Sequence, residues 1–198
     1  LPLAHLGGLG VVLRSLVTGT PVDVLPAFDA IEVATAPARR GTTLVSLVPT
    51  ALDRVDPAPF RWVVLGGSAD PATRPANVVR TYGLTETGGG VVYDGVALPG
   101  VSVRVGPGGA VSIGGPTLAR GLRAPSGEVA PVVGADGWLA TGDLGAWTPD
   151  GRLVFASRAP RGARPGADPG AQWDLFLAQP VAGSTAWQAP LPLTATAD

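Results

Sequence analysis

The sequence contains no cysteine, no methionine and no lysine. The absence of cysteine excludes disulfide bonds and thiolate metal sites, and it is compatible with the cytoplasm, where we expect the protein to work. A natural reading frame normally begins with methionine, so we expect this chain to be an internal piece of a longer protein. All 14 basic residues are arginines.

Long apolar runs and blocks of charge are also absent. No stretch approaches the roughly 20 apolar residues that span a bilayer, and the apolar residues 1–13 lack the basic flank of a signal peptide. A net charge of −1 with no basic block argues against nucleic acid or an anionic membrane surface as the partner. With 45% hydrophobic and 15% charged residues over 198 positions, the chain is typical of a globular protein with a packed core.

The first ninety residues show alternating strand and helix patterns, which predict an α/β layer with its loops at the strand ends. Residues 27–40 have helical character that begins near Asp29 and stops at Gly41. Residues 11–16 fit either a short helix or a buried strand. The remaining elements expected here are strands at 22–25, 42–48, 61–65 and 78–82, and a helix at 50–55 with Thr50 as its N-cap.

From residue 91 the pattern becomes all-β and predicts a small barrel-like subdomain over 91–158. Residues 101–105 and 110–113 alternate around a Gly-Pro-Gly-Gly turn, which predicts a hairpin. Residues 138–140 and 153–156 flank a second turn at 148–151. Residues 159–198 are rich in Pro, Gly and Arg at their start, show no sustained period, and are expected to be an irregular tail.

Two motifs carry the functional signal. Residues 81–88 read TYGLTETG, and residues 137–144 read GWLATGDL. In this order and at this distance they resemble two core motifs of the adenylate-forming ligases, which activate a carboxylic acid with ATP. The resemblance implies that the chain is part of the large N-terminal domain of such a ligase, and that ATP or AMP, Mg²⁺ and coenzyme A are its cofactors.

Catalysis of phosphoryl chemistry is mostly positioning and charge stabilisation, so hydroxyls, backbone amides and a metal-binding carboxylate are expected in the site. By resemblance Thr85 contacts the α-phosphate and Glu86 holds Mg²⁺, which prefers oxygen ligands. Tyr82 is expected to stack beside the adenine, and Gly83 to let the backbone approach the ligand. The alternative is a strand that ends in an ordinary polar turn with an exposed glutamate.

Three more segments match nucleotide-contacting positions of the family. Asp143 resembles the aspartate that accepts both ribose hydroxyls, as two carboxylate oxygens can; the alternative is an aspartate that caps a turn. Gly66, Gly67 and Ser68 resemble the small-residue loop under the adenine and acyl pocket, although a simple strand-to-helix turn has the same pattern. Arg158 falls where the family has a nucleotide-contacting arginine before its hinge.

The acyl side of the site is indicated by His5, Gly88 and Gly89. His5 matches a position that lines the acyl pocket, and we assign it substrate binding rather than proton transfer; a satisfied histidine beside a loop is the alternative. Residues 88–101 resemble o-succinylbenzoate–CoA ligases, which make a thioester in menaquinone synthesis. The glycine run at 88–90 would leave room there for a bulky aromatic acid.

The sequence departs from the family in two places. The Ser/Thr/Gly-rich phosphate loop with its lysine is expected upstream of Leu1, and the lysine-bearing C-terminal domain is expected after Arg158. A change of reading frame near codon 159 would explain the loss of pattern. Three readings therefore remain: part of an acid–CoA ligase for o-succinylbenzoate or for a fatty or aryl acid, a non-catalytic module that binds a nucleotide or acyl-adenylate, and a purely structural fragment.

Overall fold

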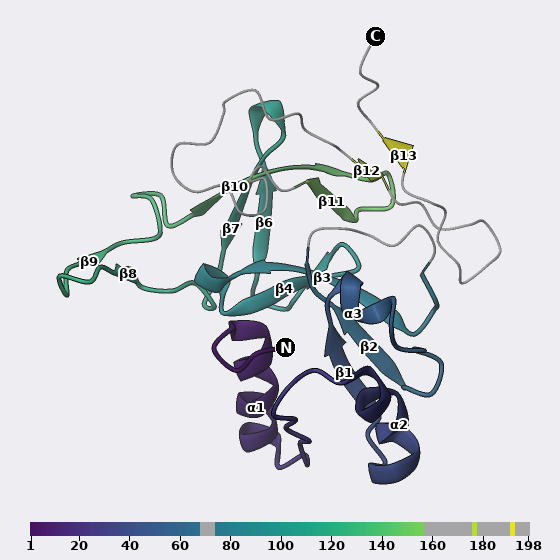
Figure 1. Ribbon diagram of the computed structural model, residues 1–198. Coiled ribbons are helices and arrows are strands. Elements are labelled where there is room, and N and C mark those ends of the chain that lie inside the picture. The colour runs from purple at the N-terminus through teal and green to yellow at the C-terminus, as the bar shows by residue number, and fades with distance from the viewer. Residues whose placement is uncertain (68–73, 157–175, 178–190, 193–198) are drawn as a thin grey trace, which may run out of the picture.

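Two sheets make up most of the computed structural model, which describes residues 1–67, 74–156, 176–177 and 191–192 (Figure 1). Within these residues the first sheet has five strands in the order β1-β2-β3-β4-β5, and the second has four in the order β11-β10-β7-β6. Two short two-stranded pairs complete the described strands, β8 (Leu122–Arg123) with β9 (Val129–Ala130), and β12 (Phe176–Leu177) with β13 (Leu191–Pro192). The architecture confirms the predicted α/β layer followed by a smaller β subdomain.

The first sheet is mixed. Strands β1 (Leu44–Leu47), β2 (Trp62–Leu65) and β3 (Val78–Leu84) run parallel, and β4 (Gly89–Tyr93) and β5 (Val96–Ala97) extend the sheet antiparallel. This sheet therefore runs past the boundary predicted at residue 90. The division of the chain at that residue stays a prediction.

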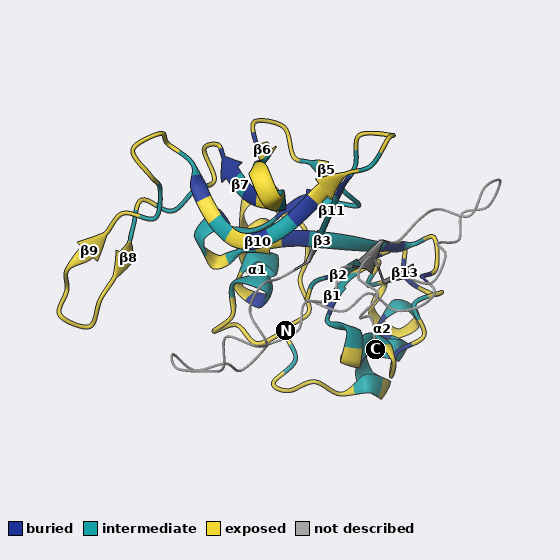
Figure 2. Cartoon of the chain, turned by 90° about the horizontal axis from the view of Figure 1, so that it is seen from above, coloured by how far each residue is buried: buried dark blue, intermediate teal, exposed yellow. Residues whose placement is uncertain are grey.

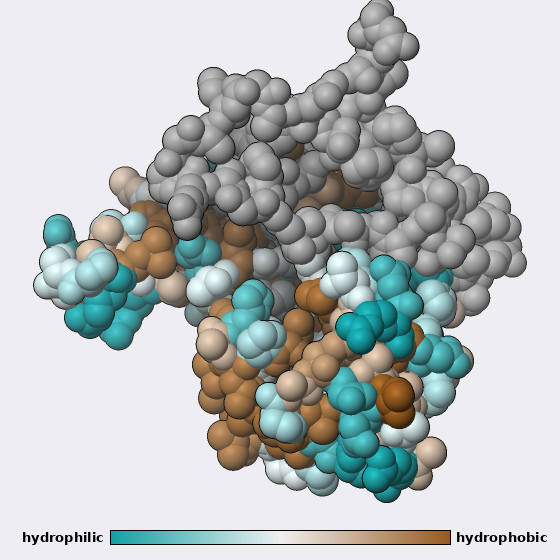
Figure 3. All heavy atoms as spheres, in the orientation of Figure 1, coloured by the Kyte–Doolittle hydropathy of each residue, from teal (hydrophilic) through white to brown (hydrophobic). Residues whose placement is uncertain are grey.

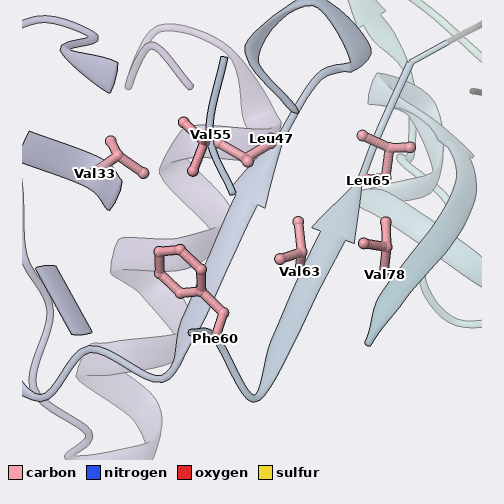
Figure 4. Packing of buried hydrophobic residues seen from close by; sticks show 7 residues of the cluster. All are labelled: Val33, Leu47, Val55, Phe60, Val63, Leu65 and Val78. Carbon is pink, nitrogen blue, oxygen red and sulfur yellow. The ribbon is translucent and has the colours of Figure 1, made fainter. Parts of the chain in front are cut away.

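The first core lies between this sheet and the helices α2 (Ala30–Arg40) and α3 (Pro49–Leu52). Val63 is fully buried and Leu65 is 2% exposed, because alternate side chains of β2 point to the same covered face. Each such aliphatic side chain contributes about 1.5–3 kcal/mol when it leaves water. Figure 4 shows the seven buried members, which are Val33, Leu47, Val55, Phe60, Val63, Leu65 and Val78.

Helix α2 begins and ends where the sequence predicts. The Asp29 carboxylate accepts hydrogen bonds from the backbone amides of Ile31 at 2.8 Å and Glu32 at 3.0 Å, and Gly41 closes the helix in the left-handed conformation at φ 71°. Helix α1 (Leu6–Thr18) confirms the helical alternative for residues 11–16. Figure 3 shows apolar side chains gathered over α1, among them the exposed Leu9, Leu13, Leu16 and Val17.

The second sheet is antiparallel throughout. Its strands are β6 (Ser102–Val105), β7 (Ala110–Gly114), β10 (Leu139–Trp147) and β11 (Leu153–Ala156). The predicted β6–β7 hairpin is confirmed, and β10 and β11 pair on either side of the turn predicted at 148–151. The β8–β9 pair, which the sequence analysis did not predict, extends from the body with exposed residues (Figure 2).

The two sheets meet at the Asp94–Gly95 turn between β4 and β5. The Arg152 guanidinium donates to the Asp94 carbonyl at 2.8 Å, and the Leu153 amide donates to the Gly95 carbonyl at 2.9 Å. A second core then spans both sheets, with Tyr82, Val91 and Val92 from the first and Val111, Ile113 and Leu153 from the second. The relative position of the two sheets is therefore fixed close to Tyr82.

Two local predictions are wrong. Residues 22–25 form no strand, because they lie between Pro21 and Pro26, and Val22 and Val24 are exposed without a backbone partner in the described ladders. The helix expected at 50–55 is the shorter α3, which begins at Pro49 with Val48 as its N-cap. Proline is favoured at the first helical position because its φ is already helical and its missing amide is not needed there.

Candidate functional site

The two motifs meet across the two sheets. The Tyr82 hydroxyl on β3 donates to Oδ2 of Asp143 on β10 at 2.8 Å, although the two residues are 61 positions apart. Tyr82 is 5% exposed and Asp143 is 7% exposed. The structure therefore brings together two residues that the sequence analysis assigned separately to the adenine and the ribose.

A β-bulge aims Asp143 at this contact. The register of β10 against β7 shifts between Ala140 and Leu144, and Gly142 supplies a φ of +78° inside the shift. The Thr141 hydroxyl accepts from the Asp143 amide at 3.1 Å and donates to the Val111 carbonyl at 2.9 Å. Thr141 thus holds the bulge in place, a role that the sequence analysis missed.

Burial changes the ionisation of the tyrosine. Desolvation raises the pKa of Tyr82 well above its ordinary value, and the negative charge of Asp143 adds to this shift, while the polar hydroxyl of Thr141 opposes it. The Tyr82 ring lies against Phe155, with ring centroids 4.0 Å apart, and the Arg80 guanidinium covers Phe155 at 4.5 Å. At neutral pH the phenol therefore stays protonated and donates a hydrogen bond to the Asp143 carboxylate.

Thr85 and Glu86 lie in a single 3₁₀ turn, Thr85–Thr87, directly after β3. Thr85 is exposed and Glu86 half-buried, and neither side chain has a hydrogen-bond or ion-pair partner within residues 1–67 and 74–156. Their hydroxyl and carboxylate oxygens are therefore presented at the end of the strand that carries Tyr82.

Thr87 holds this turn, and the sequence analysis did not single it out. Its side chain is almost completely buried, and its hydroxyl accepts from the Leu84 amide at 2.8 Å. The same hydroxyl lies 2.9 Å from the Leu84 carbonyl and 2.8 Å from the Gly89 carbonyl, either of which can take its hydrogen. The Glu86 carbonyl accepts from the Ala119 amide at 2.7 Å, so a later segment also fixes the turn.

The motif glycines differ in what the backbone requires of them. A Cβ on Gly83 would lie 1.9 Å from the Gly89 carbonyl oxygen, so only glycine permits the observed approach of β3 and β4. Gly88 and Gly89 have φ values of +73° and +113°. At Gly66, by contrast, a Cβ would lie 3.7 Å from the Thr81 hydroxyl, an ordinary contact.

The other predicted residues are placed as follows. His5 is exposed and caps α1, with its Nδ1 accepting from the Gly7 amide at 3.1 Å, and the N-terminal end of α1 lies beside β4 (Figure 1). Gly67 follows β2 with a φ of +118°. Ser68, Arg158 and the tail predicted over 159–198 lie outside the described residues, apart from the short strands β12 and β13.

No protein-family model matches the sequence, but curated proteins do. The chain is 43% identical over 168 residues to a probable 2-succinylbenzoate–CoA ligase of Mycobacterium tuberculosis, a match that covers 73% of this chain and 43% of that protein. It is 31% identical over 199 residues to the 4-coumarate–CoA ligase-like protein 6 of Oryza sativa, covering 80% of this chain and 33% of that protein. The chain thus spans less than half the length of these relatives.

Solved structures share the fold. The o-succinylbenzoate coenzyme A synthetase of Bacillus subtilis in complex with AMP superposes with a TM-score of 0.66 at 24% identity, covering 81% of this chain and 50% of that one. The same enzyme in complex with ATP and a magnesium ion gives a TM-score of 0.64 at 24% identity, covering 79% and 49%. At this level of identity the likeness is evidence for the fold.

Proposed function

We propose that this chain, a part-length relative of the adenylate-forming ligases, supplies the nucleotide- and acyl-binding part of an AMP-forming acid–CoA ligase. The whole protein would join a carboxylic acid to ATP as an acyl-adenylate and then transfer the acyl group to coenzyme A. The similarity to a probable 2-succinylbenzoate–CoA ligase, at 43% identity, supports o-succinylbenzoate as the acid. This reaction would serve menaquinone synthesis in the cytoplasm.

The observation that best supports the proposal is the contact between the motif that contains Tyr82 and the motif that contains Asp143. One end of β3 presents Thr85 and Glu86, and the same strand holds Tyr82 on Asp143 of the second sheet. The groups that we propose to bind phosphate and ribose are thereby connected through β3 and the Tyr82–Asp143 hydrogen bond. A ligand that has both a phosphate and a ribose fits this arrangement.

Asp143 is the type of acceptor that binds a ribose. An ionised carboxylate has two oxygens that each accept hydroxyl donors, and Oδ2 already accepts from the Tyr82 hydroxyl. Two vicinal hydroxyls are matched in number to the two oxygens of one carboxylate. In the proposed complex Asp143 therefore accepts from the 2′- and 3′-hydroxyls of the nucleotide.

The turn at 85–87 fits a phosphate with its metal ion. Mg²⁺ commonly keeps several waters and binds one or two carboxylates together with substrate phosphates. Glu86 offers such a carboxylate, and within the described residues no group of three metal-ligating side chains forms a self-contained metal site. Glu86 would therefore hold Mg²⁺ with the nucleotide phosphates, and the Thr85 hydroxyl would donate to the α-phosphate.

The acyl group would lie beside β4 and the N-terminal end of α1. Gly88 and Gly89 carry no side chain there, and their positive φ values disfavour other residue types at these two positions. Because Nδ1 of His5 accepts from the Gly7 amide, the neutral imidazole carries its proton on Nε2, which remains to donate to an oxygen of the acid. His5 would thus bind substrate, as predicted.

The roles assigned to this chain are binding and orientation of the nucleotide and the acid. The prediction that the Tyr82 ring lies beside the adenine stays a prediction, as do those for Gly66, Gly67, Ser68 and Arg158. The similarity to a 4-coumarate–CoA ligase-like protein supports a second candidate within the same class, a ligase for another aryl acid. A third is a module that binds an acyl-adenylate without turnover.

Binding of hydrolysis-resistant acyl-adenylate analogues to the purified chain tests the proposal. Calorimetry should give a dissociation constant for AMP below about 1 mM, equivalent to about −4 kcal/mol, and tighter binding of the o-succinylbenzoyl sulfamate analogue. Equal or better binding of a coumaroyl analogue would favour the second candidate. A chain that binds neither AMP nor any analogue at millimolar concentration would reject the proposed function.

A further inference from the structure

We propose that Tyr82 is a positioning residue, whose hydroxyl fixes the Asp143 carboxylate and thereby sets its selectivity for a nucleotide that carries ribose hydroxyls. This inference rests on the proposed function, because it concerns the ribose-binding carboxylate of that site. It assigns to the tyrosine hydroxyl a role that differs from stacking of the ring on an adenine.

The contact is built across two sheets. Tyr82 comes from β3 of the first sheet, where it pairs with Val92 of β4, and Asp143 comes from the β10 bulge in the second sheet; both are more than nine-tenths buried. The Asp94–Gly95 turn ties the same two sheets through Arg152 and Leu153. The Tyr82 hydroxyl is therefore presented to Asp143 by a rigid frame.

The carboxylate needs such a constraint. The terminal torsion of an aspartate has a broad, roughly two-fold energy profile, so its oxygens are poorly fixed by the side chain itself. Thr141 holds the backbone of the bulge through the Asp143 amide, whereas the Tyr82 hydroxyl holds oxygen Oδ2 directly. Fixing the plane of the carboxylate in advance lowers the entropic cost of binding the two ribose hydroxyls, because the sugar ring already fixes their relative positions.

The hydroxyl is suited to this role at any physiological pH. Burial and the neighbouring carboxylate raise the pKa of Tyr82, so the O–H donor persists. The ring has a separate structural role, because it packs against Phe155 and belongs to the core that spans both sheets. Replacing tyrosine by phenylalanine keeps the ring and removes only the donor.

The test is Tyr82→Phe, with Tyr93→Phe as the matched control on the other tyrosine of the chain. We expect Tyr82→Phe to weaken AMP binding about tenfold, as for the loss of one hydrogen bond to a charged group, and to leave 2′,3′-dideoxy-AMP binding unchanged. Tyr93→Phe should bind both nucleotides as the wild type does. Thermal unfolding establishes that each variant is folded.

The outcomes separate the two proposals. A wild type that prefers AMP to dideoxy-AMP supports the proposed function whatever the variant does, and one that binds neither nucleotide rejects both proposals. If Tyr82→Phe binds AMP as the wild type does, or loses affinity equally for both nucleotides, the positioning role is wrong.

A second measurement covers the case in which Tyr82→Phe does not fold. The ultraviolet absorbance of tyrosinate, followed against pH, should show the buried tyrosine ionising at lower pH in Asp143→Asn than in the wild type, because the repelling charge is gone. An unchanged titration would show that the hydroxyl is not held on Asp143 in solution and would overturn the proposal.

Discussion

Replacing Gly83 with alanine should separate β3 from β4 at the turn that carries Thr85 and Glu86. The added methyl group would lie 1.9 Å from the Gly89 carbonyl oxygen and 2.7 Å from its carbon, both of them backbone atoms. The strands must part by about 1 Å to reach the closest contact that real side chains show. Overpacking costs about 1–3 kcal/mol, and one weakened ladder hydrogen bond adds about 1 kcal/mol, which gives about 2–4 kcal/mol in total.

Urea unfolding followed by tryptophan fluorescence measures this loss. The matched control is Gly10→Ala, because Gly10 lies inside α1 with nothing within 4 Å of its added Cβ. That control should raise the unfolding free energy by about 0.5–1 kcal/mol, the difference in helix propensity. If Gly83→Ala unfolds within about 0.5 kcal/mol of the wild type, the close approach of β3 and β4 is not a constraint, and the reasoning from contact distances fails.

Three further predictions concern the same site. Thr87→Val should lower the unfolding free energy by about 1–3 kcal/mol because the half-buried Leu84 amide loses its acceptor, whereas Thr87→Ser should stay close to the wild type in the same urea titration. Gly66→Ala should leave the melting temperature unchanged, since its Cβ makes an ordinary contact, but weaken AMP binding at least about tenfold if the nucleotide lies on this backbone. The raised pKa of Tyr82 stabilises the fold fully below the pKa of an unfolded tyrosine, about 10, and this contribution is lost as the pH rises above it, by up to about 1.4 kcal/mol per pH unit. Urea titrations between about pH 9 and 11 should show this extra loss in the wild type and not in Tyr82→Phe; parallel curves would contradict the assignment.

Local signals in the sequence predicted the elements that depend on local chemistry. Asp29 and Gly41 mark the ends of α2 because capping needs only neighbouring residues, and both boundaries are confirmed. The Gly-Pro-Gly-Gly turn at 106–109 predicted the β6–β7 hairpin for the same reason. Residues 22–25 have the composition of a strand, but a strand also needs a partner, which the sequence pattern does not supply.

The sequence predicted which motifs form the candidate site, but it did not predict how their residues contact one another. The β10 bulge that aims Asp143 arises from its pairing with β7, and the bulge between Tyr82 and Gly83 arises from pairing with β4. Neither bulge can be recognised from the sequence of one strand alone. The Tyr82–Asp143 contact depends on the packing of two sheets, and a separation of 61 positions hides it from any local pattern.

The central claim is that an adenylate lies between the turn at 85–87 and the Asp143 carboxylate. A crystal structure of this chain grown with AMP tests it most directly. The account predicts both ribose hydroxyls within hydrogen-bonding distance of the Asp143 carboxylate, with the phosphate at the Thr85 hydroxyl. A nucleotide bound away from Asp143, or a crystal that takes up none at millimolar AMP, would contradict the account.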